Sequence, residues 1–383
     1  MARTPEKFRE GGIEVLLQTE ARAVDYEKSY VELAGGEKMP FDILMLATGT
    51  RPLKPDIPGI ESPGVFSLKN LEDAIHIKAY LRQNNCRKVI IIGAGFIAME
   101  MSEALHTAGV KTTIFHRGAL PANRWDPELS QLMLEELQSH GVEFVAEAQT
   151  KTISAAGKAL LTAVTNQGDW EADMIIAAVG VKPNVDLAES LGLKIGPSGA
   201  IAVNRFQQTS KENIYAAGDC CESFHRVTRR WVNIPLGDIA NKQGRVAGFN
   251  IGGKQVRFEG IVGAQSFRLF GLECAATGID EKEAKTAGFE PVSNLVWGNA
   301  IARNMGQKKL GLKLIADKAS GKLLGAQAVG ETGAVSRVNA LSVALWAGLT
   351  IEDTGWLDLA YSPPYSGAWD IIHMTAQELR RKI

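Results

Sequence analysis

The most specific chemical signal in this chain is a glycine-rich turn. Gly93-x-Gly95-x-x-Ala98 directly follows the apolar run Val89–Ile92 and opens a segment with a helical pattern. The first glycine permits a tight turn, the second lets a pyrophosphate approach the backbone, and the small third residue permits close helix–strand packing. Because the helix N-terminus faces the anion, and because a further strand follows at 111–115, the pattern predicts a dinucleotide-binding βαβ unit.

The end of that further strand carries a cation where an acid is expected. An Asp or Glu at this place holds the ribose hydroxyls of NAD, but this chain has His116 and Arg117 there. A cation can bind a 2′-phosphate instead, so the residues favour NADPH over NADH. The alternative is that Arg117 is a solvated surface residue.

Two further short segments place small residues at the ends of buried strands. These are Ala47-Thr48-Gly49 and Ala217-Gly218-Asp219, which lie on either side of the βαβ unit in the sequence. Small residues at a strand end let a ligand come close to the backbone. Each segment is weak alone, and together they argue against a simple dehydrogenase that binds one nucleotide.

Composition limits the remaining possibilities. The 42 Lys and Arg residues nearly balance the 43 Asp and Glu residues, which argues against nucleic acid or a charged membrane surface as a partner. Four cysteines in 383 residues are not a disulfide framework, so we expect a cytoplasmic protein. No apolar run could span a bilayer, and the six histidines show no spacing typical of metal ligands.

Hydrophobic patterns predict the elements that position these residues. We expect strands at 13–17 and 200–203, helices at 71–82 and 334–347, and a hairpin around the turn at 317–321. The glycine- and proline-rich stretch at 52–63 resembles a crossing between domains. The pattern of residues changes again after Gly253, where we expect a further domain to begin.

The chain resembles the pyridine nucleotide-disulfide oxidoreductases, because its motifs occur in the same order as in that family. The resemblance is strongest to the branch with coenzyme A-disulfide reductases, NADH oxidases and NADH peroxidases. The segments that carry the resemblance are LATGTRP, VIIIGAGFIAMEMSEAL, AAVGVKPN, QTSKENIYAAGDC, IPLGDIANKQGR and LDLAYSPPYS. The resemblance implies an α/β fold with two Rossmann-like domains and a C-terminal α+β dimerisation domain. The implied boundaries are 1–70 with 182–253 for FAD, 71–181 for NAD(P), and 254–383 for dimerisation.

The resemblance also implies roles for individual residues. Asp219 would bond the ribityl chain of FAD, and Phe96 would shield the flavin until nicotinamide displaces it. Glu100 would lie beside the nicotinamide, and Gly180 would contact the nicotinamide nucleotide through its backbone. The other implied contacts with FAD are Thr48, Gly49, Gly218 and the start of a helix at Leu236, Gly237 and Asp238.

The segment Tyr361-Ser362-Pro363-Pro364-Tyr365 resembles one in which the first tyrosine reaches the partner's active site across a homodimer. The implied reaction is hydride transfer from NAD(P)H to the flavin and onward to a small-molecule acceptor, coenzyme A disulfide or oxygen. The segment matching 303–306 lacks the tyrosines that relatives often carry, which argues against coenzyme A disulfide. Cys220 and Cys221 are expected to be structural.

The resemblance departs from the family at the start of the chain. Family members begin with a strand, a glycine-rich turn and a helix that hold the ADP half of FAD, followed by a redox cysteine, whereas Arg3–Phe8 matches a helix farther into that domain. We therefore expect the chain alone to hold FAD weakly. The alternative function is a truncated, non-catalytic NADP-binding dimer.

Overall fold

The computed structural model describes residues 4–155 and 160–383, so Met1 and Arg3 lie outside the described residues. The chain forms two compact units. The first takes the described residues up to Thr50 together with 183–224 and 231–259, and the second takes the rest. The first unit is therefore discontinuous in sequence. The domain boundaries at 70, 181 and 253 stay predictions.

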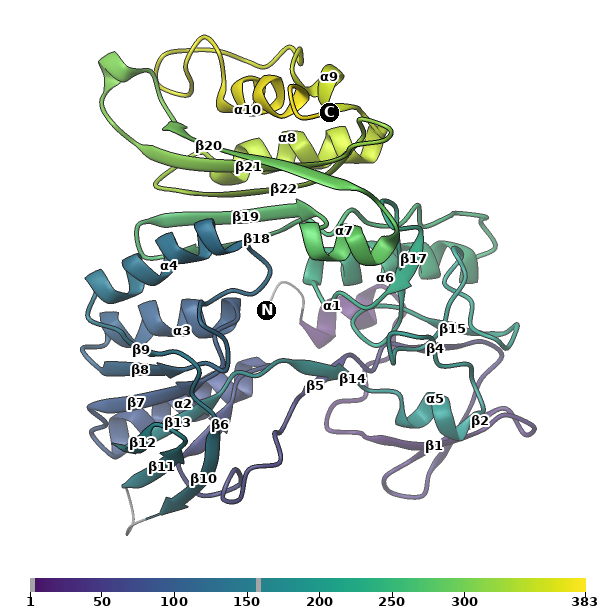
Figure 1. Ribbon diagram of the computed structural model, residues 1–383. Coiled ribbons are helices and arrows are strands. Elements are labelled where there is room, and N and C mark those ends of the chain that lie inside the picture. Colours follow the sequence, from purple (N-terminus) through teal and green to yellow (C-terminus); the bar gives the residue numbers. More distant parts are fainter. Residues whose placement is uncertain (1–3, 156–159) are drawn as a thin grey trace. The chain divides into compact units, whose positions relative to one another are not determined.

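The first unit contains the two segments with small residues. Strands β4 (Leu44–Leu46) and β15 (Ile214–Ala216) pair in parallel, so Thr48 and Asp219 follow the same edge. Helix α6 (Gly237–Ile251) packs against β15 (Figure 1). Other elements of this unit are α1 (Pro5–Glu10), β1 (Ala21–Asp25), β2 (Tyr30–Leu33), β3 (Lys38–Pro40) and α5 (Asp186–Ser190).

The second unit contains the predicted βαβ unit. Five parallel strands have the order β6-β13-β7-β8-β9, and β7 (Lys88–Ile92), α3 (Phe96–Thr107) and β8 (Lys111–Phe115) form the expected motif. Ile90 and Ile92 pack toward a three-stranded antiparallel sheet. The other elements are β6 (Val65–Ser67), α2 (Leu71–Gln83), α4 (Pro127–Ser139), β9 (Glu143–Val145), β10 (Thr150–Ala155), β11 (Leu161–Thr165), β12 (Gly168–Ala172) and β13 (Met174–Ala177).

A second large sheet in this unit is antiparallel, with the order β18-β19-β22-β21-β20. Helices α8 (Ala334–Ala347) and α10 (Ile371–Arg380) pack on it, and their apolar residues form one core with the sheet. Residues of α3 and α4 share a core with β18 and β19. The sheet therefore supports the nucleotide-binding motif directly.

The remaining elements are the strands of this sheet, the short elements beside it, and the short strands β5, β14, β16 and β17, each of which spans a point in the sequence where the chain passes from one unit to the other. Their bounds are β5 (Thr50–Pro52), β14 (Val181–Pro183), β16 (Ser223–His225), β17 (Arg230–Val232), β18 (Gln265–Leu269), β19 (Leu272–Gly278), α7 (Glu281–Ala287), β20 (Pro291–Asn299), η1 (Arg303–Met305), β21 (Lys309–Asp317), β22 (Leu323–Gly330) and α9 (Ile351–Thr354).

Two of the expected strands are wrong. Residues 13–17 form no strand, and Ile13 and Leu17 are exposed. A strand needs a neighbour that accepts its backbone hydrogen bonds, and the apolar pattern alone does not supply one. Residues 200–203 form no strand, and Ile201 makes isolated bridges to Ile195 and Cys221. The helices at 71–82 and 334–347 and the hairpin around 317–321 are confirmed.

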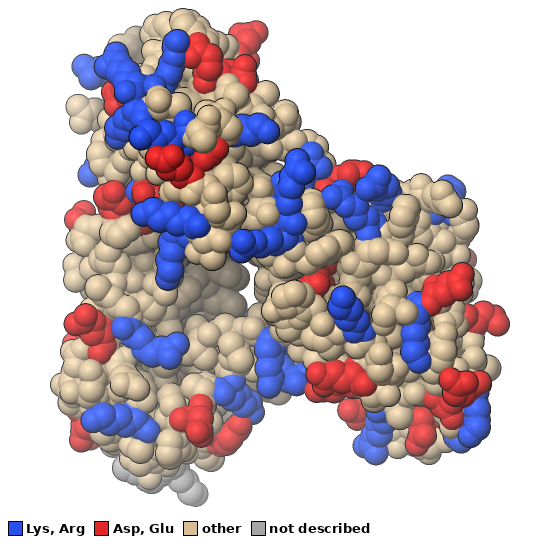
Figure 2. Space-filling view, turned by 45° about the vertical axis from the view of Figure 1, so that its right-hand side comes forward, with Lys and Arg blue, Asp and Glu red and all other residues tan. Residues whose placement is uncertain are grey.

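Charge is spread in small groups over the face that Figure 2 shows, where blue and red side chains alternate. This follows from the near balance of basic and acidic residues. Within residues 4–155 and 160–383, the helices are too short or too polar to cross a bilayer.

Candidate functional site

The glycine-rich turn has the backbone geometry that its sequence predicts. Gly93 has a φ of +109°, and a Cβ there would lie 2.3 Å from the carbonyl oxygen of Ala178. A Cβ on Gly95 would meet nothing within 4 Å, so this position faces open space. Ala98 is fully buried against β7 and its neighbours. The turn therefore fits a pyrophosphate that approaches the backbone at Gly95.

A pocket of about 660 Å³ opens at this turn, and it is lined by residues from the carboxyl ends of the parallel strands. Gly95, Phe96, His116, Arg117 and Gly180 all line it. Ligands of open parallel sheets bind at this edge. Gly93 lines it as well, so the structure brings together six of the residues that the sequence indicated for the site.

His116 and Arg117 differ in how they can carry charge. Burial lowers the pKa of His116, although its contact with Asn123, 3.1 Å from Nε2 to Oδ1, opposes the shift. Arg117 is exposed beside it and carries a guanidinium cation. The positive charge at this side of the pocket therefore comes from Arg117.

Phe96 and Glu100 lie one helical turn apart on α3. Phe96 is 42% exposed and lines the pocket. Partial burial raises the pKa of Glu100, and the nearby Glu103 carboxylate adds to the shift. Glu100 follows Phe96 by four residues and so lies on the same helix face.

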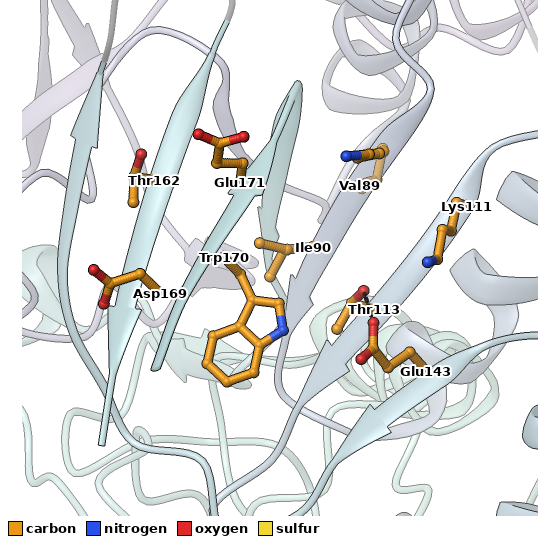
Figure 3. Close-up of a pocket in the computed structure, with 10 residues that line it drawn as sticks. Val89, Ile90, Lys111, Thr113, Glu143, Thr162, Asp169, Trp170 and Glu171 are labelled. Atoms are coloured by element: carbon orange, nitrogen blue, oxygen red, sulfur yellow. Dashed lines mark hydrogen bonds between the residues drawn. The ribbon is translucent and has the colours of Figure 1, made fainter. Parts of the chain in front are cut away.

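The same domain has a second pocket at the opposite, amino-terminal ends of the strands. Its volume is about 510 Å³, and Figure 3 shows Lys111, Trp170 and the carboxylates of Glu143, Asp169 and Glu171 around it. Those carboxylates would repel a pyrophosphate. The glycine-rich turn is at the other end of β7, and we therefore assign the nucleotide to the first pocket.

In the first unit, small residues and one carboxylate converge after β4 and β15. The hydroxyl of Thr48 donates to the carbonyl of Asn184 at 2.6 Å, and Thr50 donates to Asp219 at 3.5 Å. Gly49 has a φ of +65°, and a Cβ there would meet nothing within 4 Å. The open backbone at Gly49 and the carboxylate of Asp219 fit the hydroxyl-rich ribityl chain of FAD.

A buried glutamine holds the segment that carries Asp219. Gln243 of α6 is fully buried, and its side-chain oxygen accepts the backbone N–H of Gly218 at 2.9 Å. Its amide nitrogen donates to the carbonyl of Glu222 and to the hydroxyl of Ser223. At the start of the same helix, Gly237 offers another open backbone position. Helix α6 thus serves the expected FAD site in two ways. Gln243 holds the segment with Gly218 and Asp219, and the start of the helix supplies Leu236, Gly237 and Asp238.

All four cysteines are buried and reduced. Cys220 and Cys221 are 0% and 2% exposed, and the hydrogen bond that they share lowers the pKa of Cys220 and raises that of Cys221. Cys220 also contacts the carbonyls of Leu46 and Ala217. A redox cysteine needs access to its substrate, so this burial supports the structural interpretation.

Tyr361 lies on an exposed loop whose backbone is held by hydrogen bonds from neighbouring residues. Its side chain is 54% exposed and that of Tyr365 is 75% exposed. The guanidinium of Arg337, buried with Asp370 at 2.8 Å, donates to the carbonyl of Tyr365. The carbonyl of Pro363 accepts the backbone N–H of Ala302. The loop is therefore held by its backbone, while its aromatic rings face outward.

Sequence reasoning missed three contributors to these sites. Leu53–Ile57 line the nucleotide pocket, with Asp56 as an acidic group, and no motif indicated them. Asn123 reaches His116, and Gln243 holds Gly218. Gln243 lies within the quoted segment IPLGDIANKQGR, so its amide at a helix position facing a core was the available signal. Arg124 pairs with Glu283 and is absent from the pocket lining.

Comparison with known proteins gives consistent results. Residues 3–244 match the family model described as pyridine nucleotide-disulphide oxidoreductase, and 264–371 match its dimerisation domain. An NAD(P)H sulfur oxidoreductase (CoA-dependent) of Pyrococcus furiosus is 37% identical, with 98% of this chain and 85% of that protein covered. An NADH oxidase of Methanocaldococcus jannaschii is 32% identical, with 99% and 86% covered.

Among solved structures, an NAD-dependent persulfide reductase from A. fulgidus is similar to this chain with a TM-score of 0.96 and 37% identity. The similarity covers 99% of this chain and 71% of that one. The predicted α/β architecture with a C-terminal dimerisation domain is thus confirmed.

The two glycines of the turn allow a matched test of the pocket. Gly93→Ala places a Cβ against the Ala178 carbonyl at a positive φ, so we expect it to lower the free energy of unfolding by more than ~2 kcal/mol. Gly95→Ala places its Cβ in open space, so stability should change by less than about 0.5 kcal/mol. NADPH affinity should nevertheless fall roughly tenfold or more, because the methyl group takes the place of the pyrophosphate.

Urea unfolding and calorimetric titration with NADPH would measure both effects. A Gly95→Ala protein that is stable and binds NADPH like the wild type would contradict the assignment of this pocket.

Proposed function

Since the chain belongs to the pyridine nucleotide-disulphide oxidoreductase family, we propose that it oxidises NADPH and reduces a sulfur–sulfur bond of a small thiol compound such as coenzyme A disulfide or persulfide. NADPH gives up two electrons and one proton, solvent supplies a second proton, and one S–S bond breaks. A disulfide then yields two thiols, and a persulfide yields one thiol and hydrogen sulfide. The observation that carries the proposal is the pocket at the glycine-rich turn, with Arg117 beside it.

The residues of the nucleotide pocket have separate tasks in this proposal. The backbone at Gly95 and the N-terminus of α3 hold the pyrophosphate. Arg117 binds the 2′-phosphate, and Gly180, whose carbonyl accepts the N–H of Leu53 at 2.9 Å, presents its backbone to the nicotinamide half. Phe96 covers the site until the nicotinamide displaces its ring. Glu100 lies beside the nicotinamide.

The first unit supplies the flavin site. FAD bound here would supply hydride and single-electron chemistry that the side chains of this unit lack. Asp219 accepts hydrogen bonds from the ribityl hydroxyls, and Gly49 and Gly237 give the ligand access to the backbone. Gln243 keeps Gly218 and Asp219 in place. The relatives are named as oxidoreductases over nearly the whole chain, which favours this enzyme over the non-catalytic NADP-binding alternative.

A second candidate acceptor is oxygen. The NADH oxidase among the relatives supports it, and so does the burial of the four cysteines, because reduction of oxygen by the flavin needs no accessible thiol. In that case NADPH is consumed with oxygen and no thiol appears.

The acceptor can be identified by anaerobic assay of the FAD-loaded protein. We expect NADPH oxidation at 340 nm only when coenzyme A disulfide or persulfide is added, with two thiols released per NADPH for the disulfide. An aerobic run without sulfur compounds is the control. Oxidation that depends on oxygen alone would favour the second candidate, and no oxidation by a flavin-loaded protein would overturn the proposed function.

NADPH should bind more tightly than NADH, because Arg117 can contact the 2′-phosphate. Arg117→Glu should weaken NADPH by roughly 10- to 150-fold, the range for a hydrogen bond to a charged group, and leave NADH unchanged or improved. Lys78→Glu makes the same charge change on exposed α2 and should alter neither affinity. Equal calorimetric affinities of the wild type for NADPH and NADH would show that Arg117 does not discriminate between the two nucleotides.

We expect a homodimer formed through the residues after about Gly253. Apolar side chains are exposed there, and Val343 of α8 is 69% exposed. Val343→Arg should shift the mass measured by light scattering toward the monomer. Leu71→Arg, equally exposed at 69% on α2, should leave the dimer intact.

A wild-type monomer at micromolar concentration would contradict this prediction. In the dimer, Tyr361→Phe should slow disulfide reduction without slowing flavin reduction by NADPH.

A further inference from the structure

We propose that residues 122–126, which we call the anchor segment, fix one side of the nucleotide pocket to the antiparallel sheet, and that Lys313 is the positioning residue that holds this segment. The inference rests on the proposed function, since it assumes that the pocket binds NADPH. It assigns a role in nucleotide binding to a buried lysine of the C-terminal sheet.

The first end of the anchor segment contacts the pocket itself. The backbone N–H of Ala122 donates to the carbonyl of Ala94, within the glycine-rich turn, at 2.8 Å. The side-chain oxygen of Asn123 lies 3.1 Å from His116 Nε2, next to Arg117. Movement of these two residues would therefore displace both the pyrophosphate turn and the side of the pocket that faces the 2′-phosphate.

The second end of the segment contacts the antiparallel sheet and α7. Arg124 donates to the carbonyl of Gly278 and pairs with Glu283. The indole N–H of Trp125 donates to the carbonyl of Ala275 at 3.2 Å. The backbone N–H of Asp126 donates to the side-chain oxygen of Gln327 on β22 at 2.7 Å. Three consecutive residues thus each make a polar contact with a part of the chain about 150 to 200 positions away.

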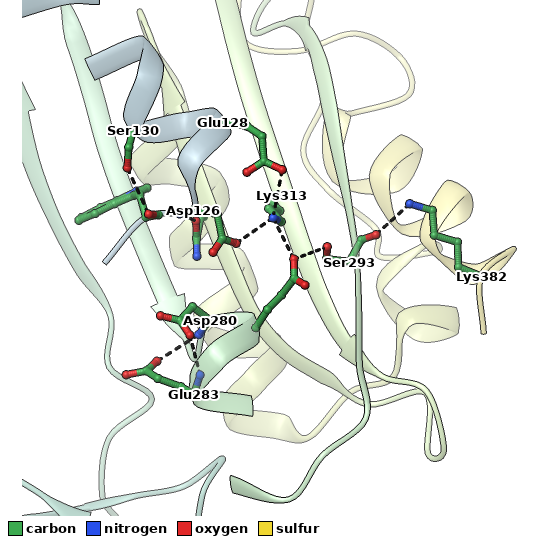
Figure 4. Close-up of polar contacts among 11 residues, drawn as sticks. Asp126, Glu128, Ser130, Asp280, Glu283, Ser293, Lys313 and Lys382 are labelled. Carbon is green, nitrogen blue, oxygen red and sulfur yellow. Dashed lines mark hydrogen bonds and ion pairs between the residues drawn. The ribbon is translucent and has the colours of Figure 1, made fainter. Parts of the chain in front are cut away.

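Lys313 pairs its positive charge with carboxylates at the second end of the segment and beside it. Its side chain is only 6% exposed, and its Nζ lies 2.9 Å from Asp126, 2.9 Å from Glu281 and 3.5 Å from Glu128. Figure 4 shows the ammonium group of Lys313 directed at the carboxylates of Asp126 and Glu128. Burial alone would lower the pKa of Lys313, but the hydrogen bonds with Asp126 and Glu281 outweigh it and raise the pKa.

Removal of this one cation would leave the buried carboxylate of Asp126 without its partner. Burial already raises the pKa of Asp126, and Lys313 opposes that shift. An uncompensated and largely buried charge is unfavourable, and Asp126 can relieve it by taking up a proton or by moving toward water. In either case its ion pair with Lys313 is lost. Asp126 is the last residue of the anchor segment, so such movement would act on the segment as a whole.

The backbone of the segment is also strained in its present place. Ala122 has a φ of +54° although it has a Cβ, and it is 3% exposed. Residues other than glycine keep this conformation only where their surroundings impose it. The contacts at the two ends of the segment supply that constraint, so their loss would free Ala122 to leave the conformation that places its N–H on Ala94.

The test compares four forms of the FAD-loaded protein: wild type, Lys313→Met, Lys313→Arg and Lys309→Met. Methionine keeps most of the lysine volume without its charge, and arginine restores the charge. Lys309→Met removes a lysine from the exposed start of the same strand. Calorimetric titration gives the affinities for NADPH and NADH, steady-state assays give KM and kcat, and hydrogen exchange reports on residues 117–126.

We expect Lys313→Met to weaken NADPH binding roughly tenfold, the size expected for one lost hydrogen bond to a charged group. KM for NADPH should rise with little change in kcat, the preference for NADPH over NADH should shrink, and exchange should quicken at 117–126. Lys313→Arg should restore most of the affinity, and Lys309→Met should resemble the wild type. A Lys313→Met protein with lowered thermal stability but unchanged affinity and exchange would overturn the inference.

Trp125→Phe provides a second test if Lys313→Met does not fold, because it removes only the N–H donated to Ala275. The affinity of this variant for NADPH should fall roughly threefold, which corresponds to part of the free energy of one hydrogen bond. An unchanged affinity would overturn the inference. Absence of NADPH binding by the wild type would overturn the proposed function itself. The two failures are therefore distinguishable.

Discussion

The nucleotide site depends on one close packing contact, that between Gly93 and the carbonyl of Ala178. The two parallel strands β7 and β13 lie side by side, so their ends meet at this point. There is no room for a Cβ at Gly93. The tight turn then leaves Gly95 facing open space and starts α3 with its N-terminus beside it. In the proposed complex, affinity for a doubly charged pyrophosphate would come from the placement of the backbone, without a lysine or arginine in the turn.

Buried cations have a different task in the C-terminal sheet. Lys313 and Arg337 are each nearly inaccessible, and each is paired with carboxylates contributed by another element. Such pairs add little net stability but specify one arrangement, because breaking them leaves a buried charge. Arg337 fixes the backbone of the loop that exposes Tyr361, and Lys313 fixes the segment beside the nucleotide pocket. Both cations act on elements that carry proposed functional residues.

Local signals in the sequence predicted much of this structure. The glycine-rich turn, the helix at 334–347 and the hairpin around 317–321 follow from patterns within a few residues, and they are confirmed. The strand expected at 13–17 failed because its apolar pattern has no pairing partner. The roles of Asn123 and Trp125 were not predictable for a related reason. Each depends on a partner that is brought close only by the folded chain, and no periodicity encodes that.

The proposed choice of nucleotide follows from how two neighbouring side chains hold charge. His116 is half-buried, and burial lowers its pKa, so it is neutral at neutral pH and contributes hydrogen bonds rather than charge. Arg117 is exposed and carries the guanidinium cation. In the proposed complex a 2′-phosphate would meet this cation on a pocket wall that His116 and Asn123 also form. In this proposal the charge of Arg117 supplies the selectivity, and the half-buried His116, which contacts the anchor segment through Asn123, supplies the position.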